Sequence, residues 1–274
     1  MKCVSLQRRF LRSVTSLLVT AASVSPLPAQ ETAWDYIGAG FGGSDFHIRD
    51  DHSSPMIFSA WGIAPEVQFI HAGERSRQYF EGSFSSAVLS TTAENFKTDN
   101  WRGRVRYAYL FSAWDFGGAD RPLRFFAGGS LNSFLSRSNY YYFIKPLNGY
   151  SSSIDSWYWS HSLDAALQLE YGIGEREFVS VQCYIPLLSN VSRPQYSPSG
   201  DYSYTENVWK MKMFGRTELF PKNVSLDLLL AFQVPLIWRL NFQAGYEFFI
   251  ASYDVPRELK MYMNNVRGGI FFCF

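Results

Sequence analysis

The chain has 274 residues, with 25 basic and 24 acidic side chains and a formal net charge of +1. Nucleic-acid binding requires a strongly basic surface, so this charge balance predicts no nucleic-acid partner. Aromatic residues make up 18% of the chain, yet no apolar run reaches the ~20 residues of a membrane-spanning helix.

Residues 1–30 have the composition of a secretory signal peptide. Four basic residues and no acidic one lie before position 13, and 13–25 is a short apolar or small-residue stretch. Pro26 to Gln30 then supplies small residues where a signal peptidase cuts. We therefore predict export, with a mature chain of 31–274. Its formal charge is −3, because 21 basic side chains face 24 acidic ones.

Most of the mature chain alternates between apolar and polar residues, which is typical of β-strands with one buried face. The clearest run is 239–252, where every even position from Leu240 to Ile250 is apolar. This pattern predicts strands at 34–47, 56–70, 79–90, 101–113, 123–136, 157–171, 178–187, 224–236, 239–252 and at the C-terminus.

The length of these runs favours a membrane barrel over a soluble β-sandwich. Strands in soluble proteins have about 5 or 6 residues, whereas a barrel strand needs ~9–11 to cross a bilayer. Short and long connections also alternate, as expected for periplasmic turns and extracellular loops. We predict an all-β protein, a transmembrane antiparallel up-and-down β-barrel of about ten strands, with twelve as the alternative. Residues 188–223 form the largest predicted loop, and within it 208–214 is either a hairpin arm or a short helix.

The C-terminus ends in apolar residues at alternate positions, namely Val266, Ile270, Phe272 and Phe274, with Gly268 between them. A last strand of this kind, ending in Phe, resembles the insertion signal of bacterial outer-membrane β-barrel proteins. The resemblance implies recognition by the barrel-assembly machinery, closure of this strand against the first, and contact with outer-membrane lipid. It covers about ten residues closely and the rest of the chain by architecture, without indicating a specific family of known function.

A charged cluster is predicted inside the barrel. Arg102, Arg104 and Arg106 occupy three successive positions on one face of a strand, and that face is opposite to the apolar one. The same alternation turns further charged residues inward, namely Glu81, Arg124, Glu247 and Arg267 together with Glu66, Asp164, Glu170 and Asp227. Buried charges need partners, so the favoured interpretation is an internal ionic plug. The alternative is an anion-selective constriction.

Two places hold residues suited to hydrolysis. Asp50, Asp51 and His52 lie in the first predicted external loop, and acidic residues beside a histidine resemble the omptin proteases, which are ten-stranded outer-membrane barrels. That resemblance requires a second pair at a matching depth, and no remote Asp-x-His partner appears in the sequence, so a solvated polar loop is favoured. His161 resembles the histidine of outer-membrane acyl hydrolases that place a serine two residues later. Here Leu163 holds that position and Ser162 faces the other way.

No cofactor or metal site is predicted. Gly38 to Gly43 matches the G-x-G-x-x-G pattern, but a dinucleotide site needs a helix that begins at these glycines, and here they lie within a strand. The favoured hypothesis is a small barrel without an evident catalytic site, with a structural or interaction role through its extracellular loops. A narrow pore is the alternative, and a lipid or peptide hydrolase comes third.

Overall fold

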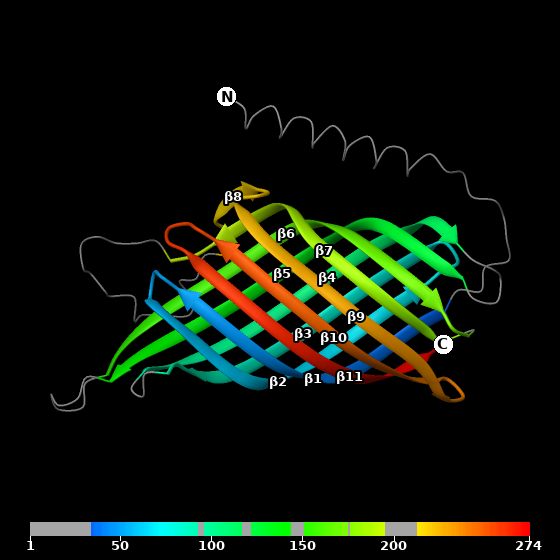
Figure 1. Cartoon of the computed structure of the whole chain (residues 1–274), viewed down its shortest axis with the longest axis horizontal. Coiled ribbons are helices and arrows are strands. Elements are labelled where there is room, and N and C mark those ends of the chain that lie inside the picture. The colour runs from blue at the N-terminus through cyan, green and yellow to red at the C-terminus, as the bar shows by residue number, and fades with distance from the viewer. Residues whose placement is uncertain (1–33, 93–95, 117–121, 144–150, 175, 195–212) are drawn as a thin grey trace, which may run out of the picture.

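The computed structural model describes residues 34–92, 96–116, 122–143, 151–174, 176–194 and 213–274 (Figure 1). The predicted signal peptide lies outside these ranges, as does most of the 208–214 segment. Within them, no helix is long and apolar enough to cross a membrane.

All regular structure in the described part is β-strand. The strands are β1 (Trp34–Asp50), β2 (Ser54–Ala72), β3 (Ser76–Ser90), β4 (Phe96–Phe116), β5 (Leu123–Phe143), β6 (Ser151–Gly172), β7 (Phe178–Ser192), β8 (Arg216–Leu219), β9 (Asn223–Ile237), β10 (Leu240–Tyr253) and β11 (Leu259–Cys273).

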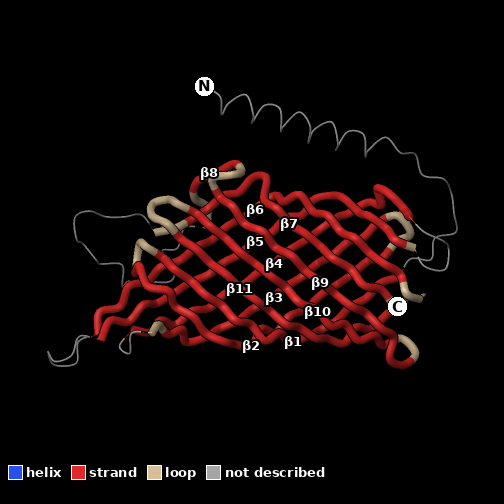
Figure 2. Tube along the Cα trace, in the orientation of Figure 1, coloured by secondary structure: helices blue, strands red, loops and turns tan. Residues whose placement is uncertain are grey.

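Ten of these strands close into an antiparallel ring, in which each long strand pairs with its neighbours in sequence and β1 pairs with β11 (Figure 2). The short β8 stands apart from the ring. It pairs with Leu188–Val191 of β7, while β9 pairs with the other end of β7, Phe178–Tyr184. The predicted up-and-down barrel of about ten strands, closed by its last strand against its first, is therefore confirmed.

The alternation of the sequence accounts for the two faces of the wall. In β10, Asn241, Gln243 and Glu247 are buried in the interior, whereas Leu240 and Ile250 are exposed on the outside. The outer face carries large apolar side chains that are more than half exposed, including Ile37, Phe41, Trp61, Ile63, Val67, Val105, Leu131 and Val266. Such a surface is stable only against lipid.

Several strands are longer than the alternation predicts. β4 and β5 have 21 residues each and β6 has 22, which is about twice what a bilayer requires. The extra length is at the outer ends of these strands, where polar residues such as Arg137, Asn139 and Asp155 occupy the outward positions in place of apolar ones. Alternation disappears there because neither face of the wall meets lipid.

Glycines on the first and tenth strands make room for charged side chains in the interior. A Cβ added to Gly245 would lie 3.2 Å from Cγ of Arg267, and one added to Gly40 would lie 3.1 Å from Oε1 of Glu66. The G-x-G-x-x-G segment lies within β1, as predicted, and its glycines permit close packing.

Candidate functional site

The three arginines of β4 form the centre of the lumen. Arg102, Arg104 and Arg106 are at most 4% exposed, because alternate residues of a strand share a face and this face is the inner one. Arg104 donates to Asp227 at 2.9 Å and also to Glu247. Arg106 donates to the same Asp227 carboxylate, which therefore joins the two guanidinium groups.

A fourth arginine extends this network to the opposite wall. Arg267 of β11 donates to Glu66 at 2.9 Å and to Glu81 at 3.2 Å. Glu81 also lies 3.9 Å from Arg106. We call these residues, with Arg102, the ionic layer: four arginines and four carboxylates, contributed by six strands.

Equal numbers of charges make the ionic layer self-compensating. Removing a charge from water costs several kcal/mol, which is recovered only when each partner is present and hydrogen-bonded. Arg102 is held differently from the others. Its guanidinium carbon lies 3.9 Å from the ring centre of Phe46, and Nη1 lies 3.4 Å from the Ser44 hydroxyl.

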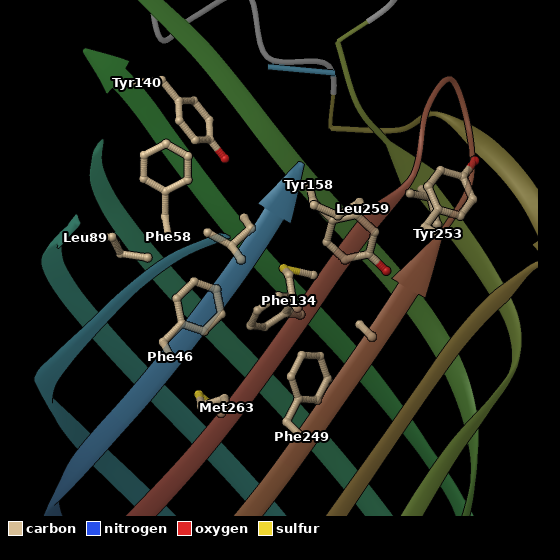
Figure 3. Packing of buried hydrophobic residues seen from close by; sticks show 14 residues of the cluster. Phe46, Phe58, Leu89, Phe134, Tyr140, Tyr158, Phe249, Tyr253, Leu259 and Met263 are labelled. Atoms are coloured by element: carbon tan, nitrogen blue, oxygen red, sulfur yellow. The ribbon is translucent and has the colours of Figure 1, made fainter. Parts of the chain in front are cut away.

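Apolar and aromatic side chains fill the lumen on the outer side of the ionic layer. Figure 3 shows this cluster. Its members that contact the arginines are Phe46, Phe134, Phe249 and Met263. Arg104 lies 5.0 Å from the ring centre of Phe249 and 5.4 Å from that of Phe134, within the range of cation–π attraction. We call this buried cluster of apolar and aromatic side chains the aromatic plug. Its members are Phe46, Ile48, Phe58, Leu89, Phe134, Tyr140, Tyr158, Val191, Phe249, Ala251, Tyr253, Leu259, Met261 and Met263.

The periplasmic side has a second layer and then a cavity. Arg77 of β3 donates two hydrogen bonds to Glu170 of β6, at 3.0 and 2.6 Å, across the lumen. Below this pair a cavity of about 730 Å³ opens, lined by Arg77, Arg124 and Glu170 among others. Beside the ionic layer, in contrast, two cavities of about 20 and 10 Å³ hold one water molecule each at most.

The predicted lumen residues thus fall into two places. Glu81, the three β4 arginines, Glu247 and Arg267 meet in the ionic layer. Arg124 lies apart from them, at the periplasmic mouth, where Nε is 3.9 Å from the carboxylate of Asp115. Arg124 is the second residue of β5, at the periplasmic end of the barrel. Its phase alone predicted it in the cluster, but it lies too far along the barrel axis to reach the ionic layer.

Asp50, Asp51 and His52 are turned in different directions. Asp50 is the last residue of β1 and is buried, accepting from Arg193 and from the Ser156 hydroxyl, each at 2.5 Å. Asp51 pairs instead with Arg49 at 2.8 Å. Burial lowers the pKa of the His52 imidazole, while the Asp50 carboxylate opposes this shift. The two carboxylates are engaged by separate arginines, so these residues form no shared site for activating water.

His161 points outward, as its phase predicts. It lies on β6, its ring centre is 5.3 Å from that of Trp159, and its Nε2 is 3.1 Å from the backbone carbonyl of Met213. Ser162 points into the lumen. On the neighbouring strand, however, Ser133 of β5 is directly opposite His161. The sequence did not reveal this pairing, because it depends on the register of two strands.

The residues of the predicted insertion signal lie on the outer wall. Val266, Ile270, Phe272 and Phe274 are all exposed, and the Phe272 and Phe274 rings stack 6.3 Å apart. The backbone of Phe274 exchanges hydrogen bonds with Asp35 of β1, so the chain ends at the seam of the barrel.

A closed sheet with an apolar outer wall and a charged interior defines a transmembrane β-barrel protein of the bacterial outer membrane. No protein-family model and no curated protein sequence matches the chain. It is similar in structure to the outer membrane protease OmpT of Escherichia coli, with a TM-score of 0.50, 8% identity, and coverage of 92% of this chain and 99% of OmpT. At this identity the likeness shows the fold alone.

Two further solved structures are similar with lower scores. Neisserial surface protein A has a TM-score of 0.36 and 12% identity, covering 87% of this chain and 96% of that protein. Ail, the attachment invasion locus protein of Yersinia pestis, has a TM-score of 0.35 and 9% identity, covering 88% and 99%.

Proposed function

We propose that the protein is a sealed barrel that acts through its outward surfaces, with a structural or interaction role of its extracellular loops, and does not conduct solutes. The observation that carries this proposal is the succession of two layers across the lumen. Arg104 holds Asp227 and Glu247 together at the centre, and the aromatic plug covers this layer on the outer side.

Opening a path for solutes through the lumen would require the paired charged groups of the ionic layer to separate in a medium of low dielectric constant. Breaking a buried ion pair by removing one partner costs about 3–5 kcal/mol, and here each carboxylate is shared by two arginines or lies beside a second acid. Barrels of about eight strands have an interior that side chains fill, whereas channels have sixteen or more. A barrel of ten strands is closer in size to the filled barrels than to the channels.

A narrow pore is the second candidate, and the periplasmic cavity of about 730 Å³ favours it. Arg77, Arg124 and Arg176 in its lining would attract small anions. The same lining carries Glu74, Glu170 and Glu177, which oppose this attraction. The Arg77–Glu170 pair and the ionic layer lie between this cavity and the outer face, so we regard it as a closed vestibule.

Conductance across a planar bilayer distinguishes these two functions. We expect refolded protein to give no reproducible ion-selective steps, and Arg104→Ala to give rare, small ones. Arg137→Ala, which removes an arginine paired with Asp155 at 3.0 Å outside the ionic layer, is the matched control and should behave as the wild type. Steady anion-selective steps of the wild type that change in Arg104→Ala would overturn the sealed barrel.

A further inference from the structure

The outer wall carries a groove that the sealed lumen does not explain. It lies over β4 to β7, beside the segment Met213–Thr217, and is an open depression with a volume of about 530 Å³. Its lower walls are apolar, formed by Val105, Leu131, Leu163 and Leu188. The volume is within the range of small-molecule sites, and the groove is continuous with the lipid-facing surface.

Polar side chains meet at one end of this groove. The register of three adjacent strands places Ser133 of β5 opposite His161 of β6, and His161 opposite Asn190 of β7. All three line the groove. Directly opposite residues in an antiparallel pair have Cβ atoms about 4.5–5.5 Å apart, so the Ser133 hydroxyl lies within reach of the His161 ring.

The hydrogen bonds of these residues set their proton positions. A carbonyl oxygen can only accept, so the 3.1 Å contact with Met213 requires the proton of His161 on Nε2. Nδ1 is then the basic nitrogen. Trp159 donates from Nε1 to the Ser133 oxygen at 3.2 Å, which leaves the hydroxyl hydrogen of Ser133 free to be donated.

Asn190 fixes the segment that orients His161. Its side chain accepts from the Gly215 amide at 2.7 Å and donates to the Thr217 hydroxyl at 3.1 Å. The ring centre of Phe214 in this segment lies 5.2 Å from that of His161, and the ring centre of Trp159 lies 5.3 Å from it. Asn190 is therefore a positioning residue, which acts on His161 through Met213.

The depth of the site in the membrane indicates its ligand. On β6, the exposed apolar positions Leu163, Leu167 and Leu169 face the hydrocarbon, and His161 follows them toward the outer end. Trp159 comes next, and tryptophans occupy the membrane–water interface. His161 and Ser133 therefore lie at the boundary between acyl chains and headgroups, where the ester bonds of lipids are found.

We propose that this groove binds one acyl chain of an outer-membrane lipid, and that Ser133 and His161 hydrolyse its ester bond. Ser133 Oγ attacks the ester carbonyl carbon while Nδ1 of His161 takes the hydroxyl proton. The C–O bond to the lipid alcohol then breaks, and His161 returns the proton to the leaving oxygen. Water, deprotonated by the same nitrogen, cleaves the acyl-serine, releasing a fatty acid and restoring Ser133.

Two measurements on refolded protein in mixed micelles of detergent and phosphatidylethanolamine test this proposal. Fatty-acid release is followed by mass spectrometry, and a fluorophosphonate probe is mapped to its labelled residue by peptide analysis. We expect the probe on Ser133, and a loss of release of about 100-fold or more in Ser133→Ala and in His161→Ala. Asn190→Ala should slow release and alter its pH profile, because His161 loses its fixed orientation.

Matched controls are Ser160→Ala, next to His161 but inside the lumen, and Ser86→Ala, exposed on the outer wall of β3. Both should retain labelling and release. Absence of the probe from Ser133 in folded protein, absence of fatty-acid release, or equal release by Ser133→Ala would each overturn the proposal. The conductance experiment is independent of these results, because the groove lies outside the lumen.

Discussion

Arg193 joins three parts of the outer rim through one guanidinium group. From the residue after β7, its Nη2 donates to the buried Asp50 carboxylate at the end of β1, at 2.5 Å. Its Nη1 donates to the backbone carbonyls of Val255 and Arg257, in the connection between β10 and β11, at 3.2 and 2.6 Å. The interaction closes the outer end of the barrel over the aromatic plug.

This relationship predicts that Asp50→Ala destabilises the protein far more than Asp51→Ala. The first change leaves Arg193, whose side chain is 2% exposed, without its carboxylate, a loss of about 3–5 kcal/mol for a buried pair. The second removes the partner of Arg49, in a pair whose side chains are 39% and 25% exposed, worth about 1 kcal/mol or less. Urea unfolding in detergent, followed by the gel mobility of the folded form, measures both. Equal midpoints of the two variants would contradict the buried role of Asp50.

The sequence was informative where the wall meets lipid. Leu240 to Ile250 alternate with Asn241 to Glu247, and this pattern predicted both the strand and the direction of each side chain. The same phase placed Arg102, Arg104 and Arg106 inside. It could not identify their partners, because Asp227 and Glu247 meet them only when the ring closes.

The aromatic plug was not predicted, for a physical reason. In its outer part β10 reads Phe248-Phe249-Ile250, with apolar residues on both faces, so alternation no longer distinguishes inside from outside. The pairing of Ser133 with His161 was also missed, since neighbours across two strands depend on loop lengths. Arg77 lies one residue into β3, before the predicted start of that strand, and so its interior position was overlooked.

Within the ionic layer, Arg104 and Glu247 should be energetically coupled. Arg104→Ala leaves Asp227 and Glu247 together without the arginine between them, and we expect a loss of about 3–5 kcal/mol. In the double variant Arg104→Ala/Glu247→Ala one of the two facing carboxylates is gone, so the loss should be smaller than the sum of the single losses. A double-mutant cycle by urea unfolding measures this coupling. Additive losses would show that the two residues act separately.

The lowered pKa of His52 predicts a dependence of stability on pH. Burial is the largest cause, Arg193 and Arg257 act in the same direction, and Asp50 opposes them. Between this lowered pKa and the ordinary value of about 6.5, the unfolded chain binds more protons than the folded one. Stability is therefore complete above about pH 6.5 and falls as the pH drops through this window.

The melting temperature in detergent, measured from pH 8 to pH 5, tests the role of His52. We expect His52→Gln to lose less stability than the wild type over this range, because glutamine does not titrate. His47→Gln is the control, since His47 lies on the outer wall beside Asp45. A wild-type profile for His52→Gln would mean that other groups, such as carboxylates, account for the acid sensitivity.

The terminal residue should matter for assembly and little for the folded state. Phe274 is exposed, and its ring stacks on that of Phe272, so its loss removes few packing contacts. If the C-terminal strand is the signal for the barrel-assembly machinery, Phe274→Ala should lower the amount of folded protein in the outer membrane of cells several-fold. Refolding into detergent in vitro should remain as for the wild type. Phe111→Ala, which changes an exposed aromatic residue on β4, is the control and should insert normally. An equal defect of Phe274→Ala in cells and in vitro would mean that Phe274 stabilises the barrel seam and does not act as a signal.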